Sequence, residues 1–499
     1  MPGLTLFTSN RMEILVEHLA NVLKDPLASP LAAEIILVQS KGMERWLSME
    51  MARRHGICAN VRFPYPIHFV NSLFRELLPG VPEHSPYEPA IVTWDIMQVL
   101  PSCTENPGFE TLKAYLERDE GDLKLFQLSG RIAVLFDHYL LFRPDMILRW
   151  DRGKDDHWQA VLWRAMVKRK GMIHRAALHD RFLRIMGDAG TRFRNVHERV
   201  SLFGISALPP FHIQILAALS SVIDVNLFLM NPCREFWGDI VSDWEMRRFA
   251  TKGKAKELLP GDLYLEVGNR LLASMGSLGR DFFHMIGEIH CKELPDFEEP
   301  GEASLLAAIQ SDILNLRERS KYDDTFISEN DDSIRVHSCH SPLREIEVLQ
   351  DSLLALFEND PDIKPDDVLV MIPDIELYAP FIQAVFSLPR DDPRWIPFTI
   401  ADRCYPDESG LIDTFLRLLD LAGSRFEVSR VLDILEADAV REKFSLSEED
   451  LELIHHWIGE TGIRWGYDEK HRETLGLPAF PWNTWRAGLE RMLLGYAMP

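Results

Sequence analysis

The stretch IILVQSKGMERWLSMEMARRHGICANVRFPYP, residues 35–66, predicts a strand, a turn and a helix in that order. Residues 35–38 are an apolar run typical of a buried strand, and the polar residues 39–42 favour a turn. The helix that follows has an apolar residue at every fourth position, the spacing of a face that packs on a core: Met43, Leu47 and Met51. A strand that leads directly into a helix indicates an α/β fold.

Two cations follow the carboxyl end of this expected strand. Lys41 and Arg45 share a helix face that lies about 200° from the apolar one. Parallel α/β sheets bind ligands at the carboxyl ends of their strands, so a cationic pair there favours an anionic ligand such as single-stranded DNA. From this segment alone, a solvated helix face is an equally good interpretation.

The composition is that of a globular protein with several domains. The chain has 499 residues, of which 46% are apolar and 26% charged, and this length predicts about three or four domains. The sequence has no apolar run long enough to cross a bilayer and does not begin with a secretory signal, so we expect no membrane partner. The six cysteines form no CxxC pair, which argues against a disulfide framework or zinc site and favours a cytoplasmic location.

The net charge restricts how the chain can bind DNA. Its formal value is −23, which argues against a protein that coats duplex DNA non-specifically, because such binding depends on neutralising phosphates. A local basic channel within an acidic body is still compatible with this charge.

The strand and helix patterns divide the chain into five parts. Three are α/β: 1–66, 190–330 and 333–405. Two are helical: 67–189 and 406–499. The helical tract 67–189 interrupts the first α/β domain, which consists of 1–66 and 190–330. The part 190–330 ends in an acidic linker. The second α/β domain has three expected strands: 333–339, 366–372 and 396–400. The chain stops directly after a helix, so we expect its last domain to be truncated.

The sequence lacks the motifs of nucleotide and metal chemistry. The first expected strand leads into Phe7-Thr8-Ser9-Asn10-Arg11, which lacks the glycines and the lysine of a phosphate-binding loop. No strand between residues 1 and 260 ends in the Asp-Glu pair of a Walker B site. One candidate nuclease motif, Asp362-Ile363-Lys364, lies in a polar stretch that a loop explains better. We therefore expect a chain that is catalytically inactive by itself and binds no cofactor.

Two α/β domains, a helical insertion and no phosphate loop resemble an inactivated superfamily 1 helicase. Successive blocks of the second domain are similar to the second motor domain of UvrD/Rep-type helicases: PLREIEVLQDSLLALF, DDVLVMIPDIELYAPFIQAVF, IPFTIADR and LIDTFLRLLDLAGSRFEVSRVLDILE. The resemblance implies an α/β protein with two RecA-like, P-loop NTPase-like domains. The first would contain a helical insertion, and the second would contain the start of another.

Shorter stretches over the whole chain resemble the RecC family, the gamma subunits of exodeoxyribonuclease V (RecBCD): SNRMEIL, ILVQSKGMERWL, GICANVRFPYP, KLFQLS, GISALPP, NPCREFWGDI, VHSCHSP, FIQAVF, GIRWG and TWRAGLERMLLGYAM. The resemblance covers the N-terminal portion of that family. It implies a non-catalytic subunit that acts in double-strand-break repair and recombination. Such a subunit forms a heterotrimer with RecB-like and RecD-like partners, takes single strands from duplex DNA ends and recognises a Chi-like sequence. ATP and magnesium would be used by the partner subunits.

The resemblance also implies DNA-binding residues, which line a channel between the first domain and its helical insertion: Gln39, Lys41, Arg45, Tyr65, Asn71, Leu135, Asp137 and Arg175, with Val134 beside them. The family's best-known pattern has Thr and Gln in place of Lys41 and Arg45, Leu and Trp in place of Tyr65 and Asn71, and Asp in place of Val134. The other four positions match it. We therefore expect the channel to be retained and the sequence that it reads to differ.

Each of these residues also has a structural interpretation. Tyr65 lies between two prolines and could pack in a turn, Leu135 has the spacing of a core residue, and Arg175 could pair with a carboxylate. Two other functions stay open as well. The chain could be a scaffold that holds catalytic partners without reading DNA, or an active helicase or nuclease, against which the missing motifs argue.

Overall fold

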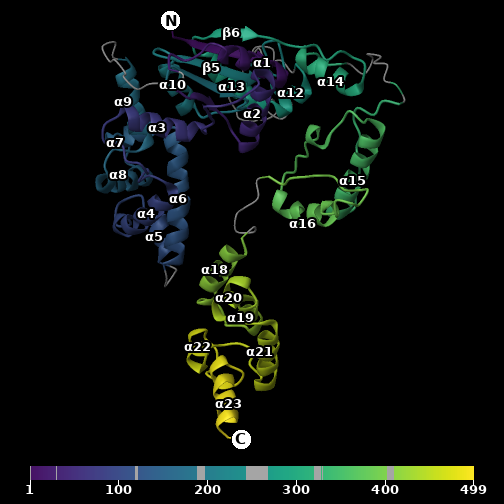
Figure 1. The fold of residues 1–499 in the computed structure, drawn as a ribbon. Coiled ribbons are helices and arrows are strands. Elements are labelled where there is room, and N and C mark those ends of the chain that lie inside the picture. Colours follow the sequence, from purple (N-terminus) through teal and green to yellow (C-terminus); the bar gives the residue numbers. More distant parts are fainter. Residues whose placement is uncertain are drawn as a thin grey trace. The chain divides into compact units, whose positions relative to one another are not determined.

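The computed structural model describes residues 2–29, 31–117, 122–187, 197–242, 268–319, 328, 330–401 and 409–498. The chain divides into two compact units, Met1–Ile334 and Arg335–Pro499 (Figure 1). The predicted boundaries at 189/190 and 405/406 fall outside the described residues. Within the described parts of the chain, no helix is both long and apolar enough to cross a membrane.

The first unit is built on a six-stranded sheet in the order β3-β2-β4-β5-β1-β6, in which every pair of neighbours is parallel. The strands are β1 Leu4–Ser9, β2 Glu34–Leu37, β3 Val61–Arg62, β4 Arg199–Phe203, β5 Asp224–Met230 and β6 Lys292–Pro295. The central strands are almost wholly buried, as expected for a parallel sheet covered on both faces.

Helices cover both faces of this sheet (Figure 1). One face packs on α1 Met12–Leu23 and α2 Lys41–His55, whose Leu15, Val16 and Leu47 meet Phe7, Ile36 and Phe228 of the strands. The other face packs on α3 Pro66–Leu77, α9 Arg175–Gly187, α10 Pro210–Leu219 and α13 Ser277–Gly287. The α/β class predicted from residues 35–66 is therefore confirmed for the first unit.

The tract between β3 and β4 is helical throughout its described residues. It contains α3 and α9 together with α4 Pro89–Cys103, α5 Glu110–Leu116, α6 Leu123–Phe142, α7 Pro144–Asp151 and α8 Trp158–Lys170. A core separate from that of the sheet holds α4 to α8 together, with Phe136, Trp150 and Trp163 fully buried. We call these helices the helical block.

The end of the part 190–330, expected to be an acidic linker, contains a helix and a strand. The helix is α14 Leu305–Leu314, and the strand is β6, which pairs with β1 from Thr5↔Lys292 to Thr8↔Pro295. Its side chains are mostly exposed, so it lacks the apolar pattern that reveals a buried strand. Its conformation depends on the hydrogen bonds that β1 offers at the sheet edge.

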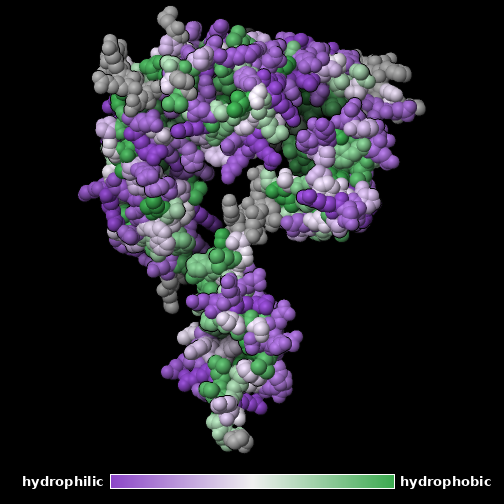
Figure 2. Space-filling view, viewed as in Figure 1, coloured by the Kyte–Doolittle hydropathy of each residue, from purple (hydrophilic) through white to green (hydrophobic). Residues whose placement is uncertain are grey.

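The described residues of the second unit form helices joined by irregular segments, without a paired strand. Its α-helices are α15 Pro342–Asn359, α16 Ile375–Phe386, α18 Gly410–Leu421, α19 Val428–Leu435, α20 Asp438–Phe444, α21 Glu448–Thr461, α22 Glu469–Thr474 and α23 Trp485–Ala497. The apolar side of α18 is exposed, with Leu411, Phe415 and Leu419 at 66%, 58% and 58%, and Figure 2 shows hydrophobic residues gathered there.

The strands predicted at 333–339, 366–372 and 396–400 are wrong for the described residues, since none of them has a paired neighbour. Val336, Leu369 and Met371 are 91%, 83% and 85% exposed. A strand is stabilised by cross-strand hydrogen bonds and side-chain pairs, and local apolar residues alone do not supply these. The second sheet implied by the resemblance is therefore not formed here.

The stacked rings of Phe7 and Phe228 give a test of the sheet. They lie opposite each other on β1 and β5, with centroids 4.6 Å apart and planes at 9°. Phe228→Ala should lower the free energy of unfolding by about 3–5 kcal/mol, because it opens a cavity in a closed core. Urea denaturation measures this, with Ile57→Ala at a 71% exposed position as the control. An equal, small loss in both variants would contradict the central place of this contact.

Candidate nucleic-acid interface

The register of the strands places the sequence-predicted residues of β2 and β3 at one edge. Glu34 lies opposite Val61 and Ile35 opposite Arg62, so the continued register brings Val38 opposite Tyr65. The Val38 amide donates to the Pro64 carbonyl at 3.4 Å, which extends this contact past the ends of both strands. Ligands of parallel sheets bind at this carboxyl edge.

In the described parts of the chain, several side chains are exposed beyond β3, β2 and β4, and we call this part of the edge the open half. Gln39, Lys41 and Arg45 are exposed there, and Tyr65 is half-buried at the start of α3. The Ser40 hydroxyl accepts from the Met43 amide at 3.1 Å and caps α2, which fixes where Lys41 stands. The amino ends of α2, α3 and α10 all follow this edge, so their dipoles add positive potential beside the two cations.

Gly204 ends β4 in the middle of the open half and has a physical reason to be glycine. Its φ is +64°, and an added Cβ would lie 2.9 Å from the Met12 methyl and 3.1 Å from the Met43 methyl. The backbone therefore turns away from the sheet at a point where a side chain would collide with α1 and α2.

The part beyond β5, β1 and β6 is closed by the chain itself, and we call it the closed half. The Asn231 amide donates to the Ser9 carbonyl at 2.8 Å, which ties the ends of β5 and β1 together. The Asn10 side chain donates to the Glu298 carbonyl at 2.8 Å and accepts from the Glu298 amide at 3.0 Å. The Glu298 carboxylate lies 3.5 Å from the Arg11 guanidinium. A carboxylate therefore neutralises the cation that follows β1.

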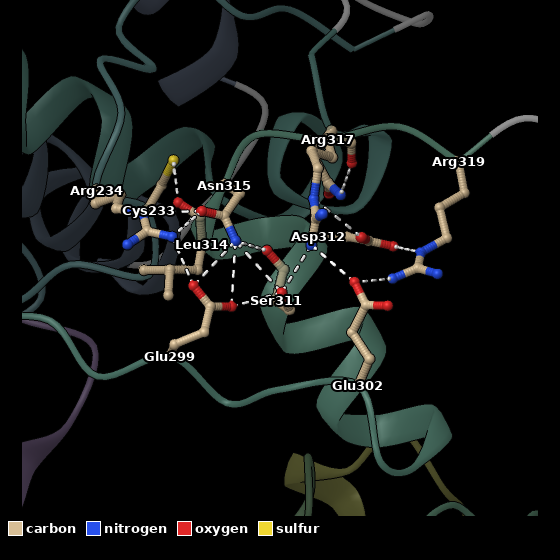
Figure 3. Close-up of polar contacts among 11 residues, drawn as sticks. Cys233, Arg234, Glu299, Glu302, Ser311, Asp312, Leu314, Asn315, Arg317 and Arg319 are labelled. Atoms are coloured by element: carbon tan, nitrogen blue, oxygen red, sulfur yellow. Dashed lines mark hydrogen bonds and ion pairs between the residues drawn. The ribbon is translucent and has the colours of Figure 1, made fainter. Parts of the chain in front are cut away.

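A polar network anchors the same segment to the loop after β5 and to α14 (Figure 3). Glu299 pairs with Arg234 at 2.5 Å and accepts from the Ser311 hydroxyl at 2.6 Å. These contacts hold the pKa of Glu299 below its usual range, with the Ser311 hydrogen bond as the largest cause. Asp312 pairs with Arg319 at 2.6 Å. The charges balance within the network, so it keeps the closed half shut without offering a net charge to a ligand.

Asp137 and Arg175 meet between the helical block and the helices of the sheet. The Arg175 guanidinium donates to the Asp137 carboxylate at 2.7 Å, and their side chains are only 16% and 19% exposed. The structural interpretation of Arg175 thus holds as far as the pairing goes, and its partner is another candidate residue. Val134 is exposed and Leu135 half-buried on the same helix, α6.

His212 lies buried beside this ion pair, and no sequence pattern pointed to it. Both of its ring nitrogens lack a hydrogen-bond partner. Burial, together with the positive charge of Arg175, lowers the pKa of His212 from its ordinary 6.5 to about 4. Burial also lowers the pKa of His179 on α9. The ion pair therefore borders a region that favours uncharged histidines at neutral pH.

The candidate residues thus fall into two groups that the structure brings together separately. Gln39, Lys41, Arg45 and Tyr65 share the open half, whereas Asp137 and Arg175 touch each other, with Leu135 nearby on the chain. Asn71 is half-buried on α3, a helix that contacts both α9 and α10. Among the residues that the structure describes, no group of three or more His, Cys, Asp or Glu side chains could hold a metal ion.

Comparison with known proteins gives the family. A family model described as "RecC, N-terminal domain" matches residues 4–316, and one described as "RecBCD enzyme subunit RecC fourth domain" matches residues 408–499. The chain belongs to the RecC family, the subunit family named for its place in the RecBCD enzyme.

Curated relatives named "RecBCD enzyme subunit RecC" match almost the whole chain. Those of Escherichia coli, Haemophilus influenzae and Mycolicibacterium smegmatis are 39%, 36% and 34% identical, each over 99% of this chain. The alignments cover 48%, 48% and 46% of the relatives. The chain therefore spans about half the length of the curated relatives that it matches.

The buried His212 predicts a pH dependence of stability. In the unfolded chain it takes up a proton below about pH 6.5, whereas in the folded chain it does so only near pH 4. Stability that is present above pH 6.5 is therefore lost as the pH falls toward 4, by about 1–2 kcal/mol between pH 7 and pH 5. His212→Gln should remove this part of the pH dependence in urea denaturation. The exposed control His284→Gln should retain it, and identical slopes in both variants would contradict the prediction.

Proposed function

We propose that the chain is a non-catalytic DNA-handling subunit of a RecBCD-type helicase and nuclease, active in double-strand-break repair and recombination in the cytoplasm. In this role it assembles with RecB-like and RecD-like subunits, takes single-stranded DNA from a duplex end and recognises a Chi-like sequence. The observation that carries the proposal is the division of the sheet edge. Cations and an aromatic ring occupy the open half, while the half where a motor would bind its nucleotide is closed.

We further propose that both α/β parts are RecA-like domains. In the first, β1 lies between β5 and β6, and the chain leaves the adjacent strands β1 and β5 in opposite directions, which defines a ligand-binding switch point. The helical block would be the insertion at 67–189. In the second, α15 and α16 pack on each other around Ile346 and Phe386, and 406–499 would begin its helical insertion.

The closed half supports a chain that hydrolyses no ATP itself. A triphosphate needs several backbone amides and a lysine where β1 ends. At that point the Asn10 side chain is bonded to Glu298, and the Glu298 carboxylate approaches Arg11. An anionic nucleotide would have to displace an internal anion. ATP and magnesium are accordingly assigned to the partner subunits.

The open half predicts salt-dependent binding of single strands. In the assembled complex, Lys41→Ala with Arg45→Ala should lower the slope of log affinity against log salt by about 1.4, which is about 0.7 for each lost phosphate contact. A titration with labelled single-stranded DNA at several salt concentrations measures this. The matched control is Arg152→Ala with Lys154→Ala, exposed cations after α7. If both double variants leave the slope unchanged, the chain acts as a scaffold at this edge.

The identity of these cations predicts an altered recognition sequence. Gln pairs with adenine, whereas Arg and Lys favour the acceptor edge of guanine, and one good bidentate pair discriminates by about 1–3 kcal/mol. The complex should therefore respond to a Chi-like octamer other than the best-known one. Degradation of linear DNA carrying candidate octamers measures the response. Lys41→Thr with Arg45→Gln should shift the preference about tenfold or more toward the best-known octamer.

The control for this shift is the same pair of substitutions away from the edge, Lys154→Thr with Arg152→Gln. It should leave the preference among octamers unchanged. Full response of the unmodified complex to the best-known octamer, with no change in the Lys41 and Arg45 variant, would mean that these residues do not read bases.

A further inference from the structure

The exposed face of α3 carries His68, which was not among the expected DNA-binding residues and lies between two that were, Tyr65 and Asn71. Tyr65 precedes the helix, and His68 and Asn71 follow at intervals of three residues. His68 is exposed and Tyr65 and Asn71 are half-buried. The opposite side of α3 is in the core, where Phe69, Val70, Leu73 and Phe74 are buried.

Helix geometry makes these side chains neighbours. Residues three apart on a helix have Cβ atoms about 5–6 Å from each other. His68 therefore lies between Tyr65 and Asn71 on the surface of α3. A single strand of DNA that contacts both Tyr65 and Asn71 along this face must pass over the His68 ring.

The rings of Tyr65 and His68 lie close to each other. Their centroids are 6.0 Å apart, and their planes are inclined by 38°. The Phe69 amide donates to the Tyr65 carbonyl at 3.0 Å, and Pro66 occupies the first turn of the helix, so the backbone that carries both rings is fixed. Two inclined, partly exposed rings on a rigid helix end form a surface on which an unpaired base can stack.

We infer that His68 and Tyr65 together form a base-stacking platform for single-stranded DNA at the open half of the sheet edge. The inference rests on the proposed function, because it names how that site holds the strand. The Val38 amide donates to the Pro64 carbonyl, the residue before Tyr65, so the platform stands beside the turn that leads to Lys41. The two cations would attract the phosphates while the rings hold the bases, a combination common in proteins that bind single strands.

A purely structural role for His68 would require its side chain to be buried or hydrogen-bonded. A histidine that supports the fold is buried or bonded, as His174 is, fully buried and 3.1 Å from Asp151. His68 is instead exposed and does not belong to the core beneath α3. Replacing it should therefore change DNA contact far more than stability.

The test needs a local readout, because other subunits of the complex also bind DNA. The assembled complex is bound without ATP to a DNA fork with two single-stranded tails. The fluorescent base 2-aminopurine is placed at successive positions of each tail in turn, since stacking on an aromatic ring changes its emission. The wild-type complex should show a change at one position or two adjacent ones.

His68→Ala and Tyr65→Ala should each abolish that change and lower the affinity for a base-bearing tail about tenfold, whereas an abasic tail at the same positions should bind the variants and the wild type equally. His68→Phe should restore both signals, because it keeps a stacking surface. The control His284→Ala, an exposed histidine on α13, should behave as the wild type. Unfolding midpoints should be alike for all of these proteins.

The outcomes separate the platform from the proposed function. If His68→Ala keeps the fluorescence change, or weakens intact and abasic tails equally, the platform is refuted. The salt slope of the Lys41 and Arg45 variant then decides whether the chain still binds the strand by its phosphates. If no position of either tail responds and that slope is also unchanged, the platform and the proposed function both fail.

Discussion

The parallel pairing of β1 with both β5 and β6 is the constraint on which the rest of the first unit depends. It brings together residues near 4, 225 and 292 of the chain, so every intervening segment must leave and return on one face of the sheet or the other. Both faces are covered by helices, and parallel α/β sheets bind ligands at their carboxyl edge. The chain then uses the two halves of this edge differently.

The division of the edge is compatible with the proposal that a strongly acidic chain binds an anionic polymer. A net charge of −23 repels DNA at long range, but screening limits this repulsion to about 8 Å at physiological salt. Within that distance the open half offers Lys41, Arg45 and the amino ends of three helices. In the closed half each arginine near the end of β1 or β5 has a carboxylate within 4 Å. Local pairing, more than the total charge, therefore decides where an anion can bind.

How much of this could be read from the sequence follows from where each element gets its stability. Residues 35–38 form a strand that is recognisable in isolation, because their own apolar side chains fill the core. β6 has exposed, charged residues and forms because β1 offers it hydrogen bonds, so no local pattern could reveal it. The strands predicted in the second unit show the opposite error, since apolar residues alone do not make a strand without a neighbour.

The candidate site shows the same limit. The exposure of Lys41 and Arg45 followed from helical periodicity, whereas the contact of Asp137 with Arg175 joins residues 38 positions apart, and periodicity gave no sign of it. The hydrogen bonds between the Asn10 side chain and the Glu298 backbone join residues 288 positions apart, and no sequence pattern indicates them. His68 is different, because its spacing from Tyr65 and Asn71 could have placed it between them as soon as the helix was predicted.

The two groups of candidate residues are connected through the helices of the first unit, so that contact of DNA with one group would affect the other. α3 carries Tyr65, His68 and Asn71 on its exposed side and contacts both α9 and α10 on its buried side. Those two helices carry Arg175 and His212, and α6 adds Asp137. A small movement of α3 would therefore act on an ion pair bordered by an uncharged histidine whose ring nitrogens have no partners. Opening that pair would leave Arg175 with neither a carboxylate nor a hydrated surface, a costly state. The Asp137–Arg175 ion pair therefore favours one placement of α6 of the helical block against α9 on the sheet.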